Sequence, residues 1–283
     1  MDKTSLAIRQ YEKFSKETVF SIRQLDEDHP NFFLINYSCV VRLSDTKPCE
    51  LFFQRQQTAY FFYKQAVDKR LPLPCPNILF YIPRGALKAE SYLGDSFLPD
   101  QVSKEDALKV IDAIALLHQH KLNGHEFDPF DHFYHYKKLT DNPLPTSFED
   151  ELIRKMRVLR GSSELVLSHN DLKRRHILFY EGRAFFIDFR NTGENLPLFD
   201  LASFFLDVDL GPDTIRACLE RYQRIAGGQS YLYQDVFDAM SFIAAYDYYH
   251  YSALARESGR AFYKEQAKLR KARCLRLFEE TIS

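Results

Sequence analysis

Residues 165–205, "LVLSHNDLKRRHILFYEGRAFFIDFRNTGENLPLFDLASFF", decide how this chain is interpreted. The runs "ILFY" and "AFFIDF", joined by "EGR", predict two short strands in a hairpin. Polar residues stand at fixed offsets around these runs: His169, Asp171, His176, Asp188 and Asp200. Polar side chains spaced in this way between strand-like runs are typical of a site built on loops.

The whole composition is that of an ordinary globular protein. The chain has 283 residues, of which 45% are hydrophobic and 27% charged. That length suits one large domain or two lobes. With a net charge of −1, the chain has no overall attraction to nucleic acid or to anionic lipid, so we expect neither as a partner. The sequence does not predict an oligomeric state.

The compartment is predicted from what the sequence lacks. The N-terminal stretch has no apolar core of a signal peptide, and no run approaches the ~20 apolar residues of a membrane span. The five cysteines are scattered and odd in number. This pattern favours free thiols in a reducing, cytoplasmic setting over a disulfide framework or a zinc site.

The first third of the chain reads as strands with one helix. The runs "NFFLINY" and "SCVVRLS" predict a hairpin, and "NILFYI" a further strand among prolines. Residues 51–70 have a helical apolar pattern. The stretch at 87–96 predicts a hinge into the larger part.

From about residue 100 the pattern becomes helical. Ser103 with Asp106 and Ser147 with Asp150 resemble capping boxes that start two helices. Gly161 predicts a helix end, and the segment after Pro212 reads as helical to the end of the chain, broken at 227–228 and Gly259. The pattern therefore predicts an α+β chain, with a small strand-rich part over 1–88 and a larger, mainly helical part over 89–283.

Transfer of a phosphoryl group from ATP needs a carboxylate to orient the acceptor hydroxyl, metal ligands at the phosphates and a cation beside them. Kinases supply these groups as His-x-Asp, an Asn five residues after that Asp, and Asp-Phe-Gly after a hairpin. This sequence has His169-Asn170-Asp171, then His176, then Asp188-Phe189-Arg190. The spacing is kept, but His176 and Arg190 differ from the pattern.

Three further segments carry a resemblance to a known family. They are "ENLPLFDLASFF", "HEFDPFDHFYHYKKL" at 125–139, and the helix end "ALLHQH". With the catalytic-loop spacing, they resemble the aminoglycoside phosphotransferase and choline kinase group, in its bacterial choline kinase branch. The resemblance implies a two-lobed protein-kinase-like fold, with ATP and Mg²⁺ as cofactors and a small hydroxyl compound as acceptor.

The resemblance also implies residue roles. Asp171 becomes the catalytic base, and His169 orients its loop. Asp188 becomes the principal metal ligand, and Asp200 braces the loop from behind. Arg42, at the end of "SCVVR", stands where the family places the cation that pairs with phosphate.

Several positions depart from that pattern. His176 replaces the metal-binding Asn, and its nitrogen suits Mn²⁺ better than Mg²⁺. The cations Lys173, Arg174 and Arg175 either pair with phosphate or form a solvated face. Arg190 stands where relatives carry Glu and is expected to pair with Asp188, in competition with the metal.

The N-terminal lobe departs as well. The segment "LDEDHPNFF" replaces a Gly-containing phosphate loop, and the helix "QRQQTAY" has no Glu for Arg42. Two hypotheses follow: an ATP-dependent phosphotransferase, or a pseudokinase that binds a ligand or partner without transfer. A third hypothesis is an unusual metal or donor nucleotide, with His176 as the adaptation.

The stretch "AAYDYYHYSAL" (244–254) has two interpretations. Tyr246, Tyr249 and His250 share a helix face, and in choline kinases late aromatic residues surround a quaternary ammonium. Together with Asp247 they form a candidate acceptor pocket; the alternative is an aromatic core face. The remaining histidines form no metal-binding motif and are predicted to be interlobe or surface residues: His118, His120, His125, His132 and His135.

Overall fold

The protein is described by a computed structural model that covers residues 2–25, 31–43, 62, 64–66, 68, 70, 73–82, 87–121, 126–227 and 230–282. Most of the predicted loop "LDEDHPNFF", the helix stretch "QRQQTAY" and His125 lie outside the described residues. Among the described helices, none is long and apolar enough to cross a membrane.

The chain folds as two compact units. The first comprises residues 1–99 and 174–192, and the second comprises 100–173 and 193–283. We expected a boundary between residues 88 and 89. This position lies within strand β5 (Leu87–Ser91), and the first unit continues to residue 99. The segment 174–192 returns to the first unit, which local sequence patterns did not indicate.

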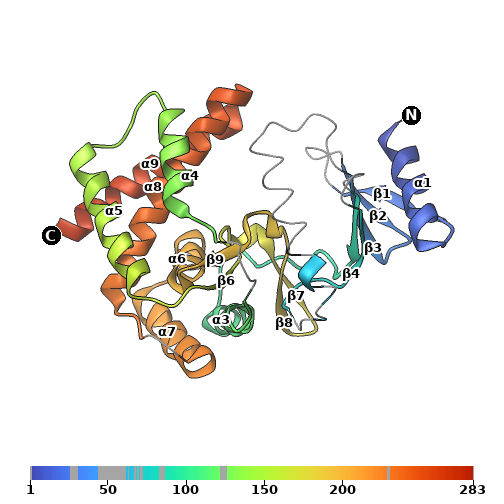
Figure 1. The fold of residues 1–283 in the computed structure, drawn as a ribbon, viewed down its shortest axis with the longest axis horizontal. Coiled ribbons are helices and arrows are strands. Elements are labelled where there is room, and N and C mark those ends of the chain that lie inside the picture. Colours follow the sequence, from blue (N-terminus) through green and yellow to red (C-terminus); the bar gives the residue numbers. More distant parts are fainter. Residues whose placement is uncertain are drawn as a thin grey trace. The chain divides into compact units, whose positions relative to one another are not determined.

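The first unit contains an antiparallel sheet of five strands in the order β1-β2-β3-β5-β4 (Figure 1). Its elements are α1 (Lys3–Ser15), β1 (Ile22–Gln24), β2 (Phe32–Ile35), β3 (Cys39–Leu43), β4 (Ile78–Ile82) and β5. The hairpin predicted from "NFFLINY" and "SCVVRLS" is confirmed as β2–β3. Asn36 and Tyr37 form its turn with φ of 53° and 58°, the geometry of a tight hairpin.

Helix α1 covers this sheet. Ala7 and Tyr11 from the helix are buried together with Phe33, Ile35 and Val41 from the hairpin. The alternation of buried residues along β3 places one face of the strand against this core. Arg42 lies on the other face of β3 and is not part of this core.

The predicted second hairpin is also confirmed, as β7 (Ile177–Tyr180) paired with β8 (Arg183–Phe186). It belongs to the first unit through backbone hydrogen bonds: Leu98 N donates to Ile177 O at 3.0 Å, and Phe186 N donates to the oxygen of Pro74 at 2.6 Å. These bonds join segments about 80 or more residues apart in the chain.

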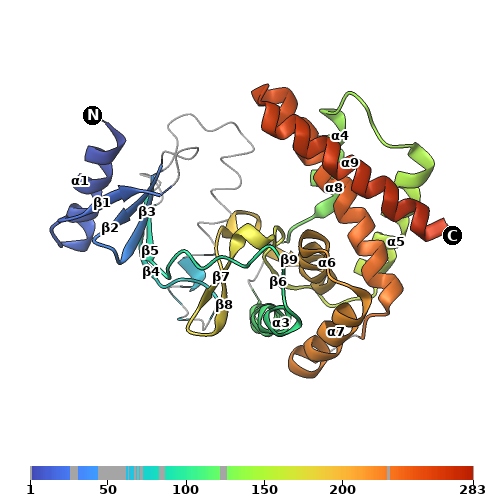
Figure 2. The same ribbon diagram turned by 180° about the vertical axis from the view of Figure 1, so that it is seen from behind.

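The second unit is mainly helical. Its helices are α3 (Lys104–His118), α4 (Pro129–Lys138), α5 (Thr146–Gly161), α6 (Pro197–Val208), α7 (Pro212–Ala226), α8 (Tyr233–Ser258) and α9 (Ala261–Ile282). Strands β6 (Val166–Ser168) and β9 (Gly193–Asn195) pair antiparallel within it. Figure 2 shows α8 and α9 packed side by side, and α3 against α7. The predicted helix ends at 161, 227 and 259 are confirmed.

The two predicted capping boxes had different outcomes. Ser103 caps α3: its Oγ accepts from Asp106 N at 3.1 Å and donates to the carboxylate of the same residue at 2.7 Å. The cap predicted at Ser147 is wrong, because α5 begins at Thr146 after Pro145 and has no side-chain cap. Pro145 itself occupies the N-cap position, and its side chain has no oxygen that could accept from the first turn.

This difference gives a matched pair of variants. We expect Ser103→Ala to lower the free energy of unfolding by about 1 kcal/mol, because two N-terminal contacts of α3 are lost. We expect Ser147→Ala, also at an exposed serine of a helix start, to change it by less than about 0.5 kcal/mol. Urea denaturation of both variants measures the difference; equal losses would contradict the assigned caps.

Candidate functional site

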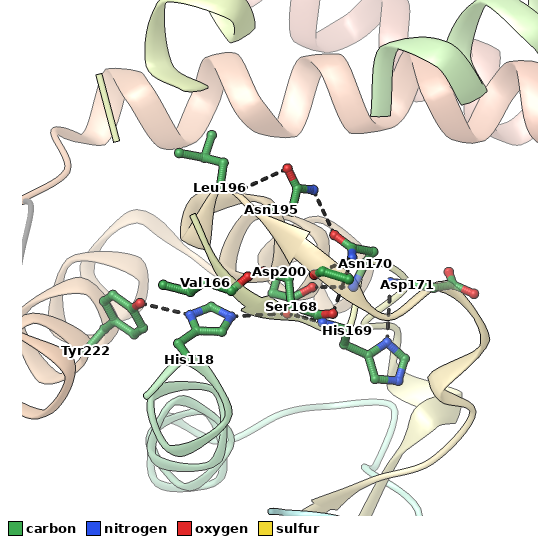
Figure 3. Close-up of polar contacts among 11 residues, drawn as sticks. His118, Val166, Ser168, His169, Asn170, Asp171, Asn195, Leu196, Asp200 and Tyr222 are labelled. Atoms are coloured by element: carbon green, nitrogen blue, oxygen red, sulfur yellow. Dashed lines mark hydrogen bonds and ion pairs between the residues drawn. The ribbon is translucent and has the colours of Figure 1, made fainter. Parts of the chain in front are cut away.

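The loop that carries Asp171 is held by the carboxylate of Asp200. Asp200 lies in the first turn of α6 and is fully buried. Its two oxygens accept from the backbone N–H groups of His169 at 2.7 Å and Asn170 at 2.8 Å (Figure 3). Because both donors belong to adjacent residues, the carboxylate fixes the loop backbone immediately before Asp171.

His118 completes the environment of Asp200. Its Nε2 lies 3.2 Å from Asp200 Oδ2, and its Nδ1 lies 2.8 Å from the hydroxyl of Tyr222. An ionised carboxylate only accepts, so a neutral imidazole at this position donates through Nε2 and accepts from Tyr222 through Nδ1. Burial raises the pKa of Tyr222, which keeps this hydroxyl a donor.

The prediction that His118 is an interlobe or surface residue is therefore wrong, because the residue is buried at the end of α3. His135 is exposed, as that prediction expected. His120 and His132 are partly buried. The sequence signal for its burial is the position of His118 at the end of the apolar stripe of α3.

Asn170 is a second fixed point of the loop that sequence reasoning missed. Its backbone has φ of 63°, a left-handed conformation that Asn tolerates better than most residues. Its side-chain amide donates to the oxygens of Ser168 and Gly193, both at 3.2 Å, and accepts from Asn195 at 2.7 Å. Strained backbone supported by several bonds is common at functional loops.

Asp171 itself projects from this network rather than into it. Figure 3 shows its carboxylate turned away from Asp200. Its side chain is 21% exposed, whereas that of Asp200 is 0% exposed. His169 Nδ1 accepts from Asp171 N at 3.3 Å, so His169 contacts the backbone of the residue that it was expected to orient. The carboxylate thus has access to a ligand while its backbone is fixed.

Lys173 is not part of a solvated face. Its ammonium lies 3.2 Å from Asp171 Oδ1 and 2.7 Å from Asp247 Oδ1, and the residue is only 5% exposed. The sequence predicted it as a phosphate-binding cation, but in this structure it is turned toward carboxylates. The carboxylate of Asp247 is therefore paired with a cation of the chain itself, the ammonium of Lys173.

Of the residues in the predicted aromatic pocket, Tyr246, Asp247 and Tyr249 are buried and His250 is partly exposed. Tyr249 is fully buried; its hydroxyl donates to Glu149 and accepts from Leu144 N at 2.8 Å. It is therefore a core residue, as the alternative interpretation held. Tyr246 and His250 stack with ring centroids 6.5 Å apart, and both contact the ring of Tyr136.

In the first unit, cations surround Asp188. The guanidinium of Arg190 binds both carboxylate oxygens, as the sequence predicted. Arg42 Nη1 lies 4.0 Å from Oδ1, and His176 Nε2 lies 3.8 Å from Oδ2. Burial opposes ionisation, but the charges of Arg190, His176 and Arg42 outweigh it and hold the pKa of Asp188 well below its usual range. Its backbone is left-handed, with φ of 65°.

The donor set at Asp188 fits a divalent cation with one restriction. Mg²⁺ needs only one or two protein carboxylates when phosphates supply the other oxygens, and Asp188 provides one. Both oxygens of that carboxylate are held by Arg190, so a metal ion competes with this guanidinium. His176 Nε2 is the nearby nitrogen ligand, but it accepts from the exposed Arg175 at 3.1 Å, so a metal ion would compete with this bond as well.

A buried ion pair next to Arg42 was missed. Lys88 on β5 lies directly across from Arg42 on β3, so the two side chains share a face of the sheet. Lys88 Nζ is 2.7 Å from Glu90 Oε2, and both residues are buried. The alternating pattern of "LKAES" could have indicated that these charged residues share one face.

Comparison with known proteins identifies a family for this chain. The model of the phosphotransferase enzyme family matches residues 62–243, more than half of the chain. The chain therefore belongs to the phosphotransferase enzyme family.

Part of the chain also matches a named relative. Protein LicA of Haemophilus influenzae is 31% identical over 103 residues, which are 34% of this chain and 39% of that protein. The match thus spans well under half of that protein's length.

Solved structures extend the likeness to the whole fold. Choline kinase LicA from Streptococcus pneumoniae superposes with a TM-score of 0.77 at 15% identity, covering 98% of this chain and 99% of that one. APH(2")-IIia, solved as its GDP and kanamycin complex, gives 0.69 at 14% identity, covering 95% and 97%. The predicted protein-kinase-like fold, with a small strand-rich part and a larger helical part, is confirmed.

The bonds of Asp200 predict a specific loss of stability. We expect Asp200→Asn to lower the free energy of unfolding by about 1–3 kcal/mol, because an amide nitrogen would face buried N–H donors. The matched control is Asp213→Asn, at a fully exposed position on α7, with an expected change below about 0.5 kcal/mol. Equal urea midpoints for Asp200→Asn and the parent protein would contradict the assigned brace.

The Arg190 contact predicts easier metal binding when it is removed. We expect Arg190→Gln to lower the Mg²⁺ concentration needed for half-maximal ATP binding by about tenfold, the effect of ~1.4 kcal/mol. Arg183→Gln removes an exposed charge from the same unit and is the control. Fluorescent-nucleotide titrations at a series of Mg²⁺ concentrations give the comparison, and identical curves for both variants would refute the competition.

Proposed function

We propose that this chain transfers the γ-phosphate of ATP to a hydroxyl group of a small molecule, either an amino alcohol of the choline or ethanolamine kind or an aminoglycoside-like sugar. The observation that carries the proposal is the state of Asp171, a partly exposed carboxylate on a loop fixed by buried hydrogen bonds. Family membership supports the reaction class.

Asp171 is proposed as the base that accepts the proton of the acceptor hydroxyl. Phosphoryl transfer depends mainly on positioning, so a base must be held at a fixed place and still be accessible. Asp200 meets the first need by fixing the backbone, and the outward direction of Asp171 meets the second. His169 is proposed as the positioning residue, through its contact with Asp171 N.

The nucleotide residues are proposed in the first unit. Arg42 is the cation for the phosphates, and Arg175, exposed beside His176, is a second candidate. Mg²⁺, or Mn²⁺ through His176, would be held by Asp188 and would neutralise phosphate charge when bound. The strand-rich part is accordingly proposed as the nucleotide-binding part, and the helical part as the catalytic and acceptor-binding part.

A second candidate function is a pseudokinase, a module that binds a ligand or partner without transferring phosphate. The two-point contact of Arg190 with Asp188 favours it, because a filled metal ligand slows or prevents assembly of the nucleotide site. We favour the enzyme, since Asp171 and Asp188 are both retained and pseudokinases often lose one of them.

The cytosol is the proposed compartment. Four cysteines in the described part of the chain form no disulfide: Cys39, Cys75, Cys218 and Cys274. Burial raises the pKa of the Cys39 and Cys218 thiols to about 12, so both stay protonated and unreactive near neutral pH. Buried unpaired thiols are typical of reducing surroundings.

Replacement of the base tests the proposal. We expect Asp171→Asn to reduce product formation about 10²- to 10⁴-fold, the usual contribution of a general base, and to retain ATP binding. Mass spectrometry of reactions with ATP and a panel of hydroxyl acceptors measures the product. Wild-type protein that binds ATP but phosphorylates no acceptor would support the pseudokinase instead.

A further inference from the structure

The ammonium of Lys173 is held by three groups of the second unit. It lies 3.2 Å from Asp171 Oδ1, 2.7 Å from Asp247 Oδ1, and 5.5 Å from the ring centroid of Tyr251. The side chains of Lys173 and Asp247 are only 6% and 4% exposed, whereas that of Asp171 is 21% exposed. The cation is therefore withdrawn from water, and its counter-charges come from the protein.

These are the groups that an alkylammonium ligand would need. Such a ligand is bound by a carboxylate and by the face of an aromatic ring. Asp247 and Tyr251 are one turn apart on α8, so they lie side by side on the helix. In this chain the Lys173 ammonium already occupies the position that they define.

A second cation approaches the same ring. The guanidinium carbon of Arg270, on α9, is 5.8 Å from the ring centroid of Tyr251. Arg270 also lies 3.5 Å from Asp207. Both observed cation contacts of Tyr251 thus come from the chain itself, and a charged ligand at this point would meet like charge.

We propose that Lys173 replaces the cation of the acceptor, so that the acceptor is a hydroxyl compound without a positive charge near its reacting group, such as a polyol or a neutral sugar. The inference rests on the proposed phosphoryl transfer and replaces the cationic acceptors named there with neutral hydroxyl compounds. An acceptor ammonium would have to displace Lys173 from Asp247 or bind next to it, and both are unfavourable.

A purely structural role makes a different prediction. The contact of Lys173 with Asp247 also ties the loop to α8, and removal of either partner leaves a buried charge. If the contact only ties the loop to α8, removal of Lys173 should lower the stability of the protein and reduce its activity equally with every acceptor. Substitution of the acceptor cation predicts in addition that removal of Lys173 creates a binding site for a small ammonium ion.

The experiment is a calorimetric titration of ethylammonium chloride into the full-length wild type, Lys173→Ala and Lys155→Ala. Lys155 also pairs with an α8 carboxylate, Asp238 at 2.8 Å, and is the matched control. We expect Lys173→Ala to bind ethylammonium at least about tenfold more tightly than the other two proteins. Equal affinities for all three proteins would overturn the proposal.

A second measurement uses only the wild type, so that it remains decisive if Lys173→Ala does not fold. Phosphorylated product is quantified with glycerol, myo-inositol and glucose as neutral acceptors, and with choline and ethanolamine as cationic ones. We expect a kcat/KM at least about tenfold higher for one of the neutral acceptors than for either cationic one. A higher value for choline or ethanolamine would overturn the inference and keep the proposed function.

Failure of the proposed function gives a separate result. If no acceptor is phosphorylated, the transferase proposal fails. The ethylammonium titration then still decides whether Lys173 occupies a cation site: selective binding to Lys173→Ala supports that occupancy, and equal binding refutes it.

Discussion

The hydrogen bonds of the Asp200 carboxylate are the interaction on which the candidate site depends. Two adjacent backbone N–H groups and the imidazole of His118 converge on one buried carboxylate. A buried charge is tolerated only when it is compensated in this way. The arrangement joins three separate parts of the chain, namely α3, the loop after β6, and α6 (Figure 3). The loop is therefore rigid where Asp171 begins.

The two aspartates of the proposed reaction have contrasting surroundings. Asp171 in the second unit lies next to the ammonium of Lys173, which Asp247 also holds. Asp188 in the first unit faces Arg190, Arg42 and His176. Both carboxylates are thus paired with cationic groups of the chain itself, and a ligand of either carboxylate would compete with those groups.

Features set by neighbouring residues were predictable from the sequence. The two hairpins, the cap at Ser103 and the contact of Arg190 with Asp188 depend on residues a few positions apart, and all were predicted correctly. The cap predicted at Ser147 is wrong because the helix begins earlier, directly after Pro145.

Features set by distant residues were not predictable. The return of segment 174–192 to the first unit depends on bonds to residues before 99. The inward direction of His118 depends on Asp200, and that of Lys173 on Asp247, each more than 70 positions away in the chain. Residue types and spacing identified the candidate roles, but which charges neutralise which followed only from the fold.

The most direct test of the account is calorimetric titration of ATP into the purified protein, with Mg²⁺ and then with Mn²⁺, for the wild type and for Asp188→Ala. The account predicts metal-dependent binding by the wild type that the variant loses, since Asp188 is the proposed metal ligand. Absence of binding with either metal, or binding that Asp188→Ala leaves unchanged, would contradict it.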